Sequence, residues 1–115
     1  MTAGETPRSP VPPEVETELQ RVVQRWHQLP LDRALSHAGR VRELVQSLAD
    51  GVAEVAGLPA SVVPDRGPAT LMDQLTVLVY DASAAAVTAA RTSALDSTLT
   101  PTLRQNLANL RRELG

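Results

Sequence analysis

The strongest constraint on the fold of this chain is an unbroken helical repeat in its second quarter. Between positions 31 and 55 apolar residues recur at alternating spacings of three and four: Leu31, Ala34, Ala38, Val41, Val45, Leu48, Val52 and Val55. This spacing places their side chains on one stripe of an α-helix and is typical of helices that cross at a shallow angle. Gly57 follows, where a left-handed cap would end the helix. Gly39 and Gly51 inside it either admit a neighbouring backbone or cost about 1 kcal/mol each relative to Ala.

Two shorter segments also have a helical period. The first is predicted over Pro13–Gln28, where Pro30 ends it and where the apolar residues are Val15, Leu19, Val22, Val23, Trp26 and Leu29. The last begins at Thr100-Pro101, a capping residue followed by a proline suited to the first helical position. Its apolar stripe consists of Leu103, Leu107, Leu110 and Leu114.

The segment that opens at Gly67-Pro68 is apolar on two sides. One stripe contains Leu71, Leu75, Leu78, Ala82, Ala85 and Ala89, and the opposite side contains Val77, Tyr80, Ala84 and Val87. A helix that is apolar nearly all round is a buried helix. We therefore expect other helices, or a second copy of the protein, to cover it on more than one side.

No alternation of period two occurs, so the sequence predicts an all-α fold. We expect a four-helix bundle built on a long central helical hairpin, with shorter N- and C-terminal helices. Residues 1–11 are expected to form a disordered tail, and residues 12–115 a single helical domain. The loop between the long helices contains Leu58, Val62 and Val63, which are expected to pin it over one end of the bundle.

Composition excludes several classes of function. The 115 residues include no Cys, so disulfides, thiolate metal sites and a cysteine nucleophile are absent. No apolar run approaches the length of a membrane span, and the first residues lack the pattern of a signal peptide, which favours a cytoplasmic protein. Lys, Ile and Phe, whose codons are AT-rich, are also absent, which indicates a high-GC bacterial genome.

Candidate catalytic groups are few. His27 is expected on the surface. His37, flanked by Arg33 and Arg40, is expected to be partly buried and bonded to a backbone or carboxylate group, and the two cations disfavour metal binding there. Asp81 lies within the apolar third helix, and we expect it to pair with Arg33 or Arg40 because an unpaired buried charge is costly.

The charged turn at positions 64–68 is expected to cap a helix rather than to bind an anion, because Pro68 removes a donor and Asp65 repels negative charge. No sequence motif for a cofactor or a metal is present, so none is expected.

The leading hypothesis is therefore a non-enzymatic helical protein–protein interaction module that associates with itself as a homodimer, through Val77, Tyr80, Ala84 and Val87. One alternative is a small DNA-associated regulator that uses Arg104, Arg111 and Arg112. The near-neutral formal charge of −2 makes this alternative weaker, and membrane binding is not expected. A second alternative is a small enzyme in which His37 and Asp81 act as acid and base, which requires that they share one cavity.

Overall fold

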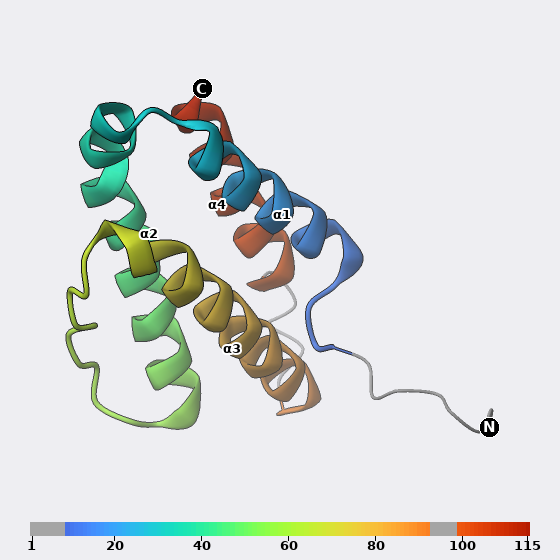
Figure 1. Ribbon diagram of the computed structural model, residues 1–115. Coiled ribbons are helices and arrows are strands. Elements are labelled where there is room, and N and C mark those ends of the chain that lie inside the picture. The colour runs from blue at the N-terminus through green and yellow to red at the C-terminus, as the bar shows by residue number, and fades with distance from the viewer. Residues whose placement is uncertain (1–8, 93–98) are drawn as a thin grey trace, which may run out of the picture.

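The chain folds as the all-α four-helix bundle that the sequence predicts (Figure 1). The structure is a computed structural model that describes residues 9–92 and 99–115, and side chains of residues 9–89 and 101–115. The predicted N-terminal tail therefore lies mostly outside the described residues. The helices are α1 (Pro13–Gln28), α2 (Leu31–Ala56), α3 (Leu71–Thr92) and α4 (Leu99–Leu114), and a 3-10 turn, η1 (Pro68–Thr70), leads into α3.

Local signals account for the helix ends. Pro13 occupies the first turn of α1, where its missing N–H would have no helical partner. Gly57 ends α2 in the left-handed conformation, with a φ of 70°, and its N–H donates to the carbonyl oxygens of Ala53 and Glu54. Asp65 Oδ1 accepts a hydrogen bond from the Gly67 N–H just before η1, at 2.9 Å, and thereby stabilises the turn that feeds α3.

The loop between the two long helices runs back along α2. Gln46 holds it at two points: its Nε2 donates to the Ser61 carbonyl at 2.9 Å, and its Oε1 accepts from the Val63 N–H at 2.8 Å. Farther back along α2, Arg42 forms an ion pair of 3.2 Å with Asp65. As a result α3 begins beside the middle of α2 and runs in the same general direction (Figure 1), unlike the second arm of a simple hairpin.

The polar anchor at Gln46 replaces the apolar one expected for this loop. Leu58 is 64% exposed and Val62 is 87% exposed, so neither pins the loop to the bundle, while Val63 is half-buried.

The helices pack mainly as two pairs, α2 with α3 and α1 with α4. Arg25, near the end of α1, donates from Nη2 to the carbonyl oxygen of Gly115 at 2.8 Å, just after the end of α4. These two helices therefore also run in the same direction. Arg40 in the first half of α2 pairs with Glu113 at the end of α4 at 3.0 Å, which sets α2 and α4 antiparallel.

All four helices contribute to one hydrophobic core, in a molecule of 47 × 37 × 22 Å, about two helices thick. The fully buried apolar members are Val15 and Val22 of α1, Val41 and Val45 of α2, Leu71, Leu75 and Val79 of α3, and Leu107, Leu110 and Leu114 of α4. The repeat of α2 is buried only in its middle, from Ala34 to Leu48, since Leu31 and Val55 are exposed.

Candidate interaction surfaces

The second apolar face of α3 is exposed. Val77, Tyr80 and Val87 are 58%, 51% and 42% exposed, and Ala84 is half-buried. The opposite face contacts α2 and the rest of the core. Among the described residues, therefore, only one side of α3 is covered, and the expectation of burial on more than one side is not met within the single chain.

This exposed stripe, Val77, Tyr80, Ala84 and Val87, adjoins a shallow depression of about 370 Å³. Apolar atoms of Val63, Val77 and Leu78 contribute to its wall, between the loop and the first turns of α3. The stripe is therefore continuous with a concave apolar surface rather than being a set of isolated exposed side chains.

A second surface centres on the buried carboxylate of Glu18 in α1. Its side chain is only 10% exposed, and Oε2 accepts a hydrogen bond of 2.8 Å from Arg111 Nε of α4. On the other side Oε1 accepts one of 3.3 Å from Arg21 Nη1, one turn along α1. One carboxylate is thus shared by two guanidinium groups from two helices.

The surrounding positive charge favours the ionised form of Glu18. The hydrogen bond from Arg111 lowers the pKa of this carboxyl below its usual value of 4.5, although burial acts in the opposite direction. The charges of Arg111, Arg21 and Arg104 lower the pKa further. Arg104 is therefore close enough to belong to the same electrostatic cluster.

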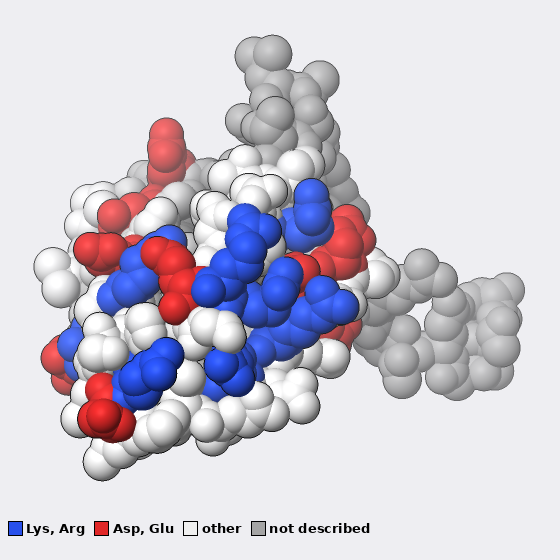
Figure 2. All heavy atoms as spheres, turned by 90° about the horizontal axis from the view of Figure 1, so that it is seen from above, with Lys and Arg blue, Asp and Glu red and all other residues white. Residues whose placement is uncertain are grey.

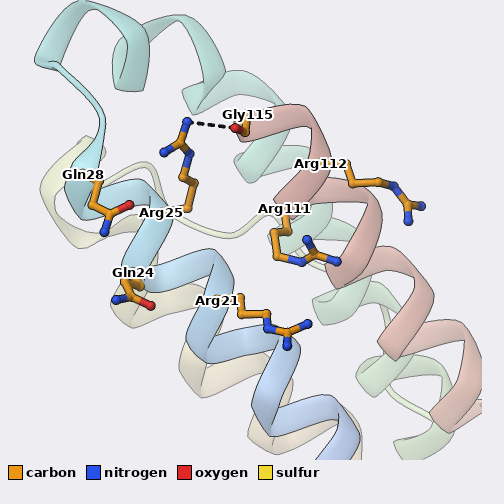
Figure 3. A pocket seen from close by; sticks show the side chains of 7 residues that line it. All are labelled: Arg21, Gln24, Arg25, Gln28, Arg111, Arg112 and Gly115. Carbon is orange, nitrogen blue, oxygen red and sulfur yellow. Dashed lines mark hydrogen bonds between the residues drawn. The ribbon is translucent and has the colours of Figure 1, made fainter.

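The arginines border a groove of about 480 Å³ between α1 and α4 (Figure 3). Its lining residues are Arg21, Gln24, Arg25, Gln28, Arg111, Arg112 and Gly115. Seen from above, the molecule shows several basic side chains gathered on this face, with acidic side chains beside and between them (Figure 2). We call Arg21, Arg25, Arg104, Arg111 and Arg112 the arginine cluster.

The three arginines singled out from the sequence have different surroundings. Arg111 is committed to Glu18 through its Nε, Arg112 donates to Asn109 Oδ1, and Arg104 is exposed. Arg21 and Arg25 were not singled out because they belong to a different helix, which only tertiary packing brings beside α4.

Glu18 was also missed, although a signal for it exists. It lies three residues after Val15 and four before Val22, both fully buried, and therefore on the core side of α1. A carboxylate at such a position needs a buried partner, whereas its place among the acidic first turns suggested only an effect of the helix dipole.

The histidines and Asp81 do not form a site. His27 is exposed, as expected, and His37 and Asp81 are half-buried. Asp81 is next to Ala82, which lines a depression with Leu48 and Val52 of α2. Those residues lie roughly 16 to 23 Å beyond His37 along the helix axis, so the structure does not bring the proposed acid and base together.

The prediction that Asp81 pairs with Arg33 or Arg40 is wrong. Arg40 pairs with Glu113 instead, and none of the four ion pairs between described residues includes Asp81 or Arg33. Nor does His37 make a hydrogen bond to another described residue through its side chain. Residue 81 is only half-buried, which lets water solvate the carboxylate and removes the need for a partner.

Within residues 9–92 and 99–115 no group of three His, Asp or Glu residues could hold a metal ion. No helix in this part of the chain is both long enough and apolar enough to cross a membrane. No known family model matches the chain, and neither the curated proteins nor the solved structures include one significantly similar to it.

Proposed function

We propose that this protein is a helical interaction module that binds a second copy of itself through the outer face of α3. The exposed stripe Val77, Tyr80, Ala84 and Val87 carries the proposal, because it leaves large apolar side chains in water on a helix whose other face is already in the core. Covering such a stripe removes apolar surface from water, at about 25 cal/mol per Å².

The order of residues in the stripe favours a second copy over an unrelated partner. The spacings are three, four and three, so two α3 helices packed antiparallel face each other symmetrically. Val77 then lies opposite Val87 of the copy, and Tyr80 lies opposite Ala84. A large ring over a small methyl group, repeated by the two-fold axis, is the self-complementary arrangement that an isologous dimer requires.

The size of the surface sets the expected strength. The stripe spans eleven residues, or about 15 Å of helix, which gives an interface at the small end of the range for stable complexes. We therefore expect a dissociation constant in the micromolar range, with Tyr80 as the main anchor because a tyrosine supplies a large contact area and a polar tip.

Sedimentation velocity and light scattering test the proposal. At about 100 µM the natural protein is expected to be dimeric and Tyr80→Glu monomeric, because the charge would have to be buried. Leu31→Glu is the matched control: it places the same charge on another exposed apolar residue, at the start of α2, and should leave the dimer intact. A natural protein that stays monomeric at this concentration, or a Tyr80→Glu variant that dimerises equally well, would contradict the proposal.

The DNA-associated alternative receives less support from the described residues. Arg104, Arg111 and Arg112 lie within nine residues of α4, which allows fewer phosphate contacts than the extended basic surface from which nucleic-acid binding gains affinity. A gel shift at about 50 mM salt, where phosphate contacts are least screened, is its test, and retardation of a duplex there would favour it.

A further inference from the structure

The arginine cluster carries more positive charge than the acidic side chains bonded to it can neutralise. It contains five of the chain's eleven basic residues, although the formal charge of the whole chain is −2. Among the described residues Glu18 is the one acidic side chain bonded to the cluster, and no acidic side chain lines the groove. The backbone oxygen of Gly115, the last residue of the sequence, also lies in the lining and accepts from Arg25. Like charges held this close repel one another, so an anion that binds between them lowers the electrostatic free energy of the cluster.

Several guanidinium donors remain for a ligand. Among the described residues Arg111 bonds through Nε, Arg21 through Nη1 and Arg25 through Nη2. Each guanidinium has five N–H groups in a planar fork that matches the oxygens of a phosphate. In Figure 3 the Arg21 and Arg111 side chains extend into the space between α1 and α4, while Arg25 lies at the end of the groove beside Gly115.

The groove also provides a neutral wall. Gln24 and Gln28 stand one turn apart on α1 and line it, and neither amide bonds to another described residue. The groove is open to solvent, and its volume of about 480 Å³ exceeds that of a bare phosphate. A group larger than a bare phosphate therefore fits, with its charged end at the arginines and a polar, uncharged part at the two amides.

We propose that the groove between α1 and α4 binds the phosphate group of a small phosphorylated molecule through Arg21, Arg25 and Arg111. A short groove favours such a ligand over a nucleic-acid backbone, which gains affinity from many phosphate contacts along an extended basic surface. This site is on different helices from the exposed stripe of α3, and it does not depend on self-association.

Isothermal titration calorimetry with pyrophosphate and with AMP tests the proposal at about 50 mM salt, where ion pairs are least screened. Saturable binding of both is expected, and the double variant Arg21→Gln/Arg25→Gln should weaken it at least about tenfold, because two charge-assisted contacts are lost. Arg33→Gln, which removes the same kind of charge from an exposed position on α2, should change it less than about twofold.

Three results would overturn the proposal. The first is the absence of saturable binding of both probes, and the second is an equal loss of affinity in Arg33→Gln, which would mean attraction to net charge alone. The third is binding of a single-stranded oligonucleotide that strengthens with its length while pyrophosphate and AMP fail to bind, which would assign the groove to nucleic acid. Circular dichroism of each variant verifies that the helical content is unchanged.

Discussion

At the scale of single residues, Glu18 is the side chain whose packing between helices also determines its protonation. It joins α1 to α4 through Arg111, and the same interaction lowers its pKa. A carboxyl whose pKa is lowered on folding stabilises the folded state above its unfolded value of about 4.5, and this stabilisation is lost as the pH falls through the folded value. Glu18 therefore contributes to stability at neutral pH and favours unfolding in acid.

Glu18→Gln should remove this contribution. At neutral pH we expect a loss of about 1 to 3 kcal/mol, because charged hydrogen bonds to two arginines become neutral ones. The natural protein should lose stability more steeply than the variant as the pH falls below about 4.5, because the variant keeps no titratable group at this position. Urea unfolding at several pH values measures both effects.

Glu14→Gln serves as the control, since Glu14 lies exposed in the first turn of the same helix. It should change the stability by no more than about 0.5 kcal/mol. If Glu18→Gln retained the full acid dependence of the natural protein, the lowered pKa of Glu18 would not be the cause of that dependence.

At the scale of helices, the sequence predicted the boundaries of α1 and α2 well because the signals for them are local. Pro13, Pro30 and Gly57 act on their own backbone, and α1 and α2 begin and end where these residues require. By contrast, α3 begins at Leu71 after a 3-10 turn, and α4 begins at Leu99, before the predicted cap at Thr100. The direction of α3 was not predictable in this way, because it depends on Gln46 binding backbone groups 15 and 17 residues further along. No periodicity encodes such a contact.

The candidate sites also combine features that are local in the sequence with features that depend on tertiary packing. The repeat in α3 identified two apolar stripes, but it did not tell which stripe the core would cover, since both consist of Leu, Val and Ala with a single Tyr. The arginines of α1 and α4 are separated by some 90 residues, and each group alone appears as an ordinary solvated face. Packing of α1 on α4 makes them one cluster.

The two glycines inside α2 lead to a prediction about the stability of this helix. A methyl group built on Gly39 or Gly51 meets no atom within 4 Å, so neither residue serves a close approach of another backbone. Gly39→Ala and Gly51→Ala should each stabilise the protein by about 0.5 to 1 kcal/mol, and their effects should add because the sites are distant.

Urea unfolding measures these changes, with Gly57→Ala as the contrasting variant. Gly57 has a φ of 70°, where an alanine is strained, so this substitution should destabilise by about 1 kcal/mol. Destabilisation by Gly39→Ala or Gly51→Ala would show that the space around the glycine is used by something other than the described residues of one chain.

At the scale of the whole molecule, the charged surface and the apolar surface lie on different pairs of helices. The pair of α1 and α4 presents the arginine cluster around one buried carboxylate, whereas α3 presents an apolar stripe on the other pair of helices. Pairing through α3 therefore uses none of the arginines of the cluster, which lie on α1 and α4. The antiparallel register is the most specific consequence of this arrangement, and it can be tested by cross-linking because the chain contains no natural Cys.

Val77→Cys and Val87→Cys proteins, mixed in equal amounts and oxidised, should form mostly the mixed disulfide. In an antiparallel pair residue 77 of one copy faces residue 87 of the other, within reach of a disulfide whose Cα atoms are about 4.4 to 6.8 Å apart. Each protein alone should cross-link slowly, at the rate of Val62→Cys, which reports random collisions from an exposed loop. Rapid cross-linking of Val77→Cys with itself would instead require parallel helices. Rates equal to that of Val62→Cys in every mixture would mean that α3 is not the interface, because a specific dimer must bring at least one of these pairs together faster than diffusion does.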